Sequence, residues 1–127
     1  MAGAPDGLSA RAVASLARQS TGGVIHIATS DTRADAMAQA LAFFAPDAVV
    51  LSFPAWDCMP YDRVSPSHAI LGQRTETLSQ LAAGDAALDA PTILLTTVNA
   101  AVARIPARES LAGTNFSATV GCSLELD

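Results

Sequence analysis

Three short and almost continuously apolar runs alternate with helical segments, and this arrangement constrains the fold more than any other feature. The runs cover residues 24–28, 48–53 and 92–96. A helical pattern, with apolar residues three or four positions apart, covers about 9–19, 32–44, 67–83 and 98–104. Strands that are apolar on both faces need cover on both sides, which the helices of a parallel α/β sheet supply. The sequence therefore predicts an α/β fold with a parallel sheet and helices on both of its faces.

Polar residues ahead of the helical segments predict where the helices begin. Ser9 is expected to cap the first helix, and the pair Gly22-Gly23 ends it. Thr32 and Asp35 have the spacing of a capping box for the second helix.

An arginine interrupts the apolar stripe of the third helical segment. Arg74 has the helical spacing that places it on one face with Ile70 and Leu78, so we expect its guanidinium to be buried. A buried guanidinium needs an acidic partner, and the irregular stretch before the helix offers Asp57 and Asp62. Such a pair would hold that stretch on the helix. The alternative is an exposed arginine that binds a partner protein.

The C-terminal segment has a different pattern. Apolar and polar residues alternate strictly over 116–126, which is typical of a half-exposed strand in an antiparallel sheet. We therefore expect a domain boundary near Gly113, with one domain over 1–113. Residues 114–127 would form the first strand of a second, incomplete domain.

The charge composition excludes several classes of function. The chain has 127 residues and a formal net charge of −5, and all seven basic residues are arginine. A chain without lysine has no phosphate-loop lysine, no Schiff-base lysine and no polybasic patch. The acidic balance argues against independent binding of nucleic acid. Neither a membrane-spanning run nor a signal peptide is evident, and Cys58 and Cys122 lie far apart, so a cytoplasmic setting is expected.

Glycines near the start occupy the place of a phosphate-binding loop ahead of the first helix. The candidate positions are Gly3, Gly7, Ser9 and Ala10. Such a loop requires a lysine for the phosphates and a hydroxyl for magnesium, where this chain has Ser9 and Ala10. We expect a degenerate loop that binds no nucleotide and a segment that is not an enzyme.

The remaining reactive residues do not form a recognisable metal or catalytic site. His26, His68, Cys58 and Cys122 lack the spacing of zinc ligands, so no metal and no other cofactor is expected. His26 is expected to be a core histidine of a strand, and His68 a solvated residue in the first turn of a helix.

The irregular stretch over 54–66 is expected to be structural rather than catalytic. Trp56 and Tyr61 are the only tryptophan and tyrosine of a chain with 5% aromatic residues, so their burial would stabilise the core strongly. Pro54, Pro60 and Pro66 restrict the backbone of this long connection.

This stretch also carries a resemblance. Residues 53–66, FPAWDCMPYDRVSP, resemble the pattern (L/F)P-x-W-(D/E)-x-x-PYD-x-x-SP near the N-terminus of bacterial transcription-repair coupling factors, the Mfd family. The matching positions are Trp56, Asp57, Pro60, Tyr61, Asp62, Ser65 and Pro66. The likeness continues through an Arg-x-x-x-Leu step, Arg74 and Leu78, and a Val-Asn-Ala step that contains Asn99. It spans about residues 3–127.

The resemblance implies a non-catalytic segment of a protein that links stalled RNA polymerase to nucleotide excision repair through UvrA. This region of the family is similar to the first domain of UvrB, which implies a RecA-like fold without a nucleotide site. In the family, a small inserted domain follows and makes the main contact with UvrA, and a separate motor translocates on DNA. The alternatives are a fragment of a UvrB-type ATPase and an unrelated α/β domain that binds a small molecule at its strand ends.

Overall fold

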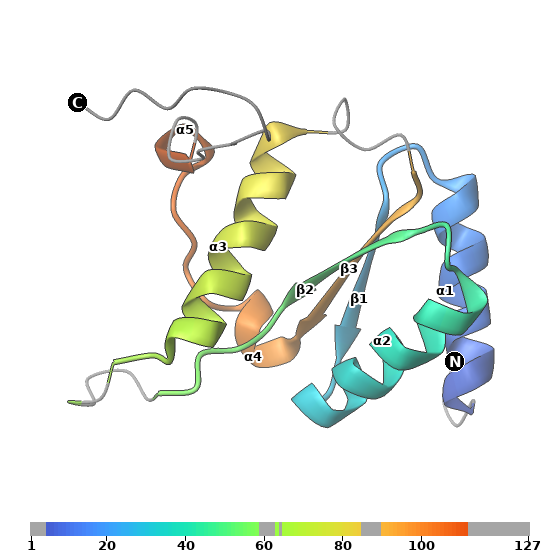
Figure 1. The fold of residues 1–127 in the computed structure, drawn as a ribbon, viewed down its shortest axis with the longest axis horizontal. Helices are drawn as coiled ribbons and strands as arrows, with labels where there is room; N and C mark the ends of the chain where they lie inside the picture. The colour runs from blue at the N-terminus through green and yellow to red at the C-terminus, as the bar shows by residue number, and fades with distance from the viewer. Residues whose placement is uncertain (1–4, 59–62, 64, 85–89, 112–127) are drawn as a thin grey trace, which may run out of the picture.

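The structure, a computed structural model, describes residues 5–58, 63, 65–84 and 90–111. In chain order these residues hold α1 (Asp6–Gln19), β1 (Val24–Ala28), α2 (Asp31–Phe44), β2 (Val49–Phe53), α3 (His68–Ala83), β3 (Thr92–Thr97), α4 (Val98–Ala101) and α5 (Arg108–Leu111). The strands form a parallel sheet in the order β1-β3-β2 (Figure 1). The predicted α/β fold with a parallel sheet is confirmed. The boundary near Gly113 and the strand expected over 116–126 lie outside the described residues.

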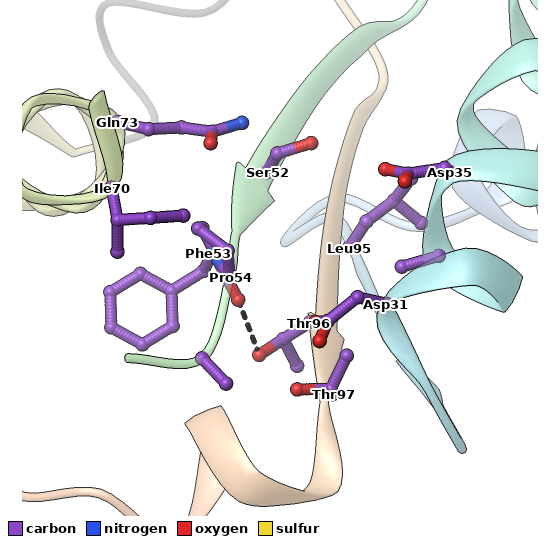
Figure 2. A pocket seen from close by; sticks show the side chains of 12 residues that line it. Asp31, Asp35, Ser52, Phe53, Pro54, Ile70, Gln73, Leu95, Thr96 and Thr97 are labelled. Carbon is purple, nitrogen blue, oxygen red and sulfur yellow. Dashed lines mark hydrogen bonds between the residues drawn. The ribbon is translucent and has the colours of Figure 1, made fainter. Parts of the chain in front are cut away.

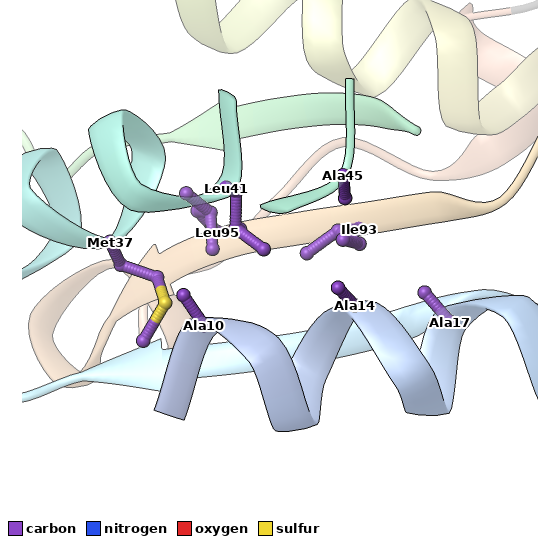
Figure 3. Packing of buried hydrophobic residues seen from close by; sticks show 8 residues of the cluster. All are labelled: Ala10, Ala14, Ala17, Met37, Leu41, Ala45, Ile93 and Leu95. Carbon is purple, nitrogen blue, oxygen red and sulfur yellow. The ribbon is translucent and has the colours of Figure 1, made fainter. Parts of the chain in front are cut away.

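Small residues allow α1 and α2 to pack closely on one face of the sheet. The core between them joins alanines of α1 to larger side chains of α2 and β3 (Figure 3), and its members are Ala10, Ala14, Ala17, Met37, Leu41, Ala45, Ile93 and Leu95. Because alanine projects only a methyl group, α1 approaches the central strand β3 closely enough to exclude water from Ile93 and Leu95.

The opposite face of the sheet is covered over β2 and open over β1. There α3 packs on β2 and buries Leu51 and Phe53 (Figure 1). The parallel register places Ile25 and Leu51 on either side of Leu94, but Ile25 is 66% exposed and Ile27 is 52% exposed. The prediction of helices on both faces holds, but burial of β1 on both faces was wrong. The sheet order makes β1 an edge strand beyond the reach of α3.

Two of the expected helix starts were wrong. In α1 the Pro5 carbonyl accepts the N–H groups of Leu8 and Ser9, at 3.0 and 3.1 Å, so the helix begins before Ser9 and Pro5 is its N-cap residue. In α2 the N-cap is Ser30, whose Oγ accepts the N–H of Arg33 at 3.3 Å. Both helices therefore begin one to three residues earlier than the polar pattern suggested.

The early start of α1 also corrects the expected phosphate-loop region. Gly7, Ser9 and Ala10 lie within α1 and not in a loop ahead of it, and Ala10 is fully buried in the core. Gly3 lies outside the described residues. The ψ angle of Pro5 is 147°, outside the helical range, so the helix begins directly after Pro5.

Candidate functional site

The guanidinium of Arg74 lies between two aromatic rings that come from the end of β2. Its Cζ atom is 3.9 Å from the ring centroid of Phe53 and 4.1 Å from that of Trp56. Nη1 donates a hydrogen bond of 2.5 Å to the carbonyl oxygen of Pro54, and the residue is only 2% exposed. The burial predicted from helical spacing is confirmed. These three contacts fasten residues 53–56 to α3, and we call them the arginine cage.

The predicted ion pair between Arg74 and Asp57 was wrong. The Asp57 carboxylate instead accepts the backbone N–H of Ser67, with both oxygens at 3.2 and 3.3 Å. Ser67 precedes Arg74 by seven residues, about 10 Å along a helix axis, which separates the two groups. Within the described part of the chain, no carboxylate forms an ion pair with Arg74. Asp62, the other expected partner, lies outside that part.

The surroundings of these two charges shift their pKa values for different reasons. Ser67, through its side-chain hydroxyl first and its backbone N–H second, stabilises the carboxylate of Asp57 and lowers the pKa of that group. Burial lowers the pKa of Arg74, because desolvation disfavours the charged form. An arginine begins from so high a pKa that Arg74 keeps its charge at neutral pH. The aromatic faces and the Pro54 carbonyl therefore stabilise a cation that lacks a formal counter-charge among the described residues.

Trp56 is 39% exposed, so its predicted burial was wrong. One face of its indole contacts Arg74, and the ring also forms a wall of an open groove of about 630 Å³. The groove lies between the segment after β2 and the α4 region. Its lining residues are Ala55, Trp56, Cys58, Pro66, Asn99, Val102 and Ala103. Three positions of the family pattern, Trp56, Pro66 and Asn99, are thus brought together.

The other positions of the family pattern are dispersed or not described. Leu78 is half-buried on α3, and Ser65 is exposed ahead of that helix. Pro60, Tyr61 and Asp62 lie outside the described residues. The sequence argument missed Thr77, a neighbour of Leu78. Thr77 is buried, and its Oγ1 donates a hydrogen bond of 2.6 Å to the carbonyl oxygen of Ser52 on β2.

A second cavity, of about 200 Å³, opens at the carboxyl ends of β2 and β3 (Figure 2). Ligands of parallel α/β proteins bind at such strand ends. Figure 2 shows Asp31 and Asp35 on the α2 side of this cavity and Thr96 and Thr97 on β3. The Thr96 hydroxyl donates a hydrogen bond of 2.9 Å to the carbonyl oxygen of Phe53. The rule that strand ends carry sites could have located this cavity from the sequence, but its lining depends on the sheet order.

The two histidines belong to different elements, β1 and α3. His26, which was expected in the core, is only half-buried in β1, where burial lowers its pKa. His68 is exposed in the first turn of α3, as expected. Across residues 5–58, 63, 65–84 and 90–111, no group of three or more His, Cys, Asp or Glu residues could hold a metal ion. None of the helices described in this chain is long and apolar enough to cross a membrane.

Comparison with known proteins gives a short sequence match to one kind of protein. No protein-family model matches the chain. Over 39 residues the chain is 49% identical to the transcription-repair-coupling factor of Rickettsia bellii (strain RML369-C). The match takes in 31% of this chain and 4% of that protein. The likeness therefore covers about a third of this chain and a short portion of a much longer protein.

Proposed function

We propose that this chain is a non-catalytic segment of a transcription-repair coupling factor, which links stalled RNA polymerase to nucleotide excision repair. The observation that carries this proposal is the 49% identity over 39 residues to the Rickettsia bellii protein of that name. The packing of the family pattern supports it, because Trp56 and Arg74 of that pattern contact each other and Trp56 shares a groove with Asn99. We propose that the fold is a RecA-like domain whose nucleotide site is lost, in a cytoplasmic protein.

The absence of ATP chemistry in this segment is part of the proposal. The chain contains no lysine, and the strand-end cavity is lined by the carboxylates of Asp31 and Asp35, which would repel phosphates. Its volume of about 200 Å³ is also below the roughly 300 Å³ at which ligand pockets begin, which disfavours a small-molecule site. Titration calorimetry with Mg-ATP should give no saturable heat. A micromolar dissociation constant would contradict this part of the proposal.

In the proposed role, contact with UvrA is made mainly by a domain that follows residue 113, and this segment joins that domain to the rest of the coupling factor. Pull-downs with UvrA should therefore capture a protein extended beyond Asp127 and leave residues 1–127 unbound. Equal capture of residues 1–127 and of the extended protein would refute the assignment of the UvrA contact to the following domain. With a net charge of −5, residues 1–127 should also fail to shift duplex DNA at physiological salt.

A strand-specific repair assay in the organism that carries this gene separates the proposed function from the UvrB-type alternative. After ultraviolet irradiation, deletion of the gene should remove the faster repair of transcribed strands and leave repair of non-transcribed strands intact. Loss of a UvrB-type subunit would abolish repair of both strands. Unchanged repair of transcribed strands would overturn the proposal.

A further inference from the structure

The last part of the described chain runs back from α4 along α3 and reaches the carboxyl end of that helix (Figure 1). We call residues 104–111, which follow the last backbone hydrogen bond to α4, the arm. We propose that the arm is a hinged segment that Arg108 fastens to the end of α3, so that this residue sets the direction in which the chain continues beyond Leu111. The inference concerns residues 1–127 and does not depend on the proposed function.

The arm buries little apolar surface of its own. All of its residues are exposed except Leu111, which is half-buried, and α5 within it has four residues and no buried side chain. A helix this short is not stable in water by itself, because fixing its first turn costs more than the few hydrogen bonds return. The position of α5 therefore depends on what fastens it to α3.

Arg108 fastens the arm to the last turn of α3. Its Nε and Nη2 atoms donate hydrogen bonds of 3.2 and 2.9 Å to the carbonyl oxygen of Ala82. The last carbonyl groups of a helix have no acceptor role within the helix and carry a partial negative charge. The guanidinium satisfies one of these carbonyls and places a cation where the dipole of α3 favours it.

The glycine after α3 makes room for this contact. Gly84 is the C-cap residue of α3 and has a φ angle of 82°, and a Cβ atom in its place would lie 3.2 Å from Nη2 of Arg108. A larger residue would therefore strain the backbone and displace the guanidinium. The cap glycine and the arginine, from separate segments, thus support the same contact.

Limited proteolysis with trypsin measures release of the arm. Trypsin cleaves after lysine and arginine, and this chain offers seven arginines and no lysine. Cleavage after Arg104, at the start of the arm, is fast when the arm leaves α3, because a protease acts on locally opened chain. Cleavage after Arg74, which is 2% exposed, requires unfolding of the core. The ratio of the two rates therefore separates release of the arm from loss of overall stability.

Arg108→Ala should raise the rate of cleavage after Arg104 by about threefold or more and leave the rate after Arg74 unchanged. Alanine is the better helix former, so this gain cannot come from a lower helix propensity of α5. The matched control is Glu109→Ala, which removes the neighbouring exposed charge of α5 and should leave both rates unchanged. Gly84→Ala should raise the ratio as Arg108→Ala does. An unchanged rate after Arg104 in Arg108→Ala, equal gains in Glu109→Ala, or rates that rise together at Arg104 and Arg74 would overturn the proposal.

Discussion

Truncation of Arg74 to alanine tests whether a cation can be stabilised in a protein core by rings and a carbonyl. The lost hydrogen bond from Nη1 to the Pro54 carbonyl is worth about 1.5–3 kcal/mol, because its donor is charged. Each contact with the rings of Phe53 and Trp56 contributes about 0.5–2 kcal/mol. Removal of the cation also relieves its desolvation, which offsets part of the loss. We therefore expect Arg74→Ala to lower the free energy of unfolding by about 3 kcal/mol.

Two further substitutions at this position separate charge from shape. Arg74→Lys keeps the charge but loses the planar group that stacks between Phe53 and Trp56, so it should cost about 2 kcal/mol. Arg74→Met removes the charge but fills the space with a flexible thioether that packs well on aromatic rings. It should cost less than half as much as Arg74→Ala. Urea unfolding followed by circular dichroism measures all three values, provided that the denaturant slope is unchanged.

A double-mutant cycle with Asp57→Asn gives the result that would refute this reasoning. Since Asp57 bonds to Ser67 and not to Arg74, the effects of Asp57→Asn and Arg74→Ala should add to within about 0.5 kcal/mol. A coupling energy above about 1 kcal/mol would mean that the two charges form a pair after all. Destabilisation by Arg74→Met as large as that by Arg74→Ala would likewise show that the charge, and not the stacking, dominates.

Three further substitution experiments use controls within the chain. Thr77→Val should cost about 1–3 kcal/mol, because it leaves the partly buried carbonyl of Ser52 on β2 without this donor. Thr75→Val, whose exposed hydroxyl bonds within its own helix, should change the free energy of unfolding by less than about 0.5 kcal/mol. Gly23→Ala should cost about 1–2 kcal/mol, because φ is 77° and the new Cβ would lie 3.0 Å from a carbonyl oxygen of β3, whereas Gly22→Ala has open space and should be neutral in the same melts. Burial lowers the pKa of His26 below that of the unfolded chain, about 6.5, so stability should fall as pH decreases from about 6.5 toward the folded pKa, and His26→Leu should flatten that part of the stability profile.

Much of the fold could be predicted from the sequence because its signals are local. Residues 24–28 are apolar except for His26, and β1 has those bounds. Ser67 stands directly before a helical pattern, and its Oγ caps α3 by accepting the N–H of Ile70 at 3.4 Å. Burial of Arg74 followed from its spacing relative to apolar neighbours on one helix face. Each of these predictions depends on residues within a few turns of one element.

Features that depend on distant parts of the chain could not be predicted in the same way. The exposure of Ile25 and Ile27 follows from the order β1-β3-β2, which places β1 at an edge that α3 does not cover. The partner of Arg74 depends on the path of the segment after β2. That path brings aromatic rings to the guanidinium and turns Asp57 toward the start of α3. The rule that buried arginines pair with carboxylates therefore predicted the wrong partner, Asp57, although the predicted burial of Arg74 was confirmed.

The sequence set two interpretations of the aromatic and proline-rich segment against each other, a structural clamp and a partner-binding surface. The geometry makes them compatible, because Trp56 contacts Arg74 and is still 39% exposed. Arg74 contacts the Trp56 ring and fastens it to α3, and Trp56 also lines the open groove. A substitution at Arg74 should therefore lower the free energy of unfolding and disturb the position of Trp56 in the groove. A substitution at Val102, which lines the same groove and is 79% exposed, should leave the free energy of unfolding unchanged, and this difference separates the structural role of the segment from any role of its surface.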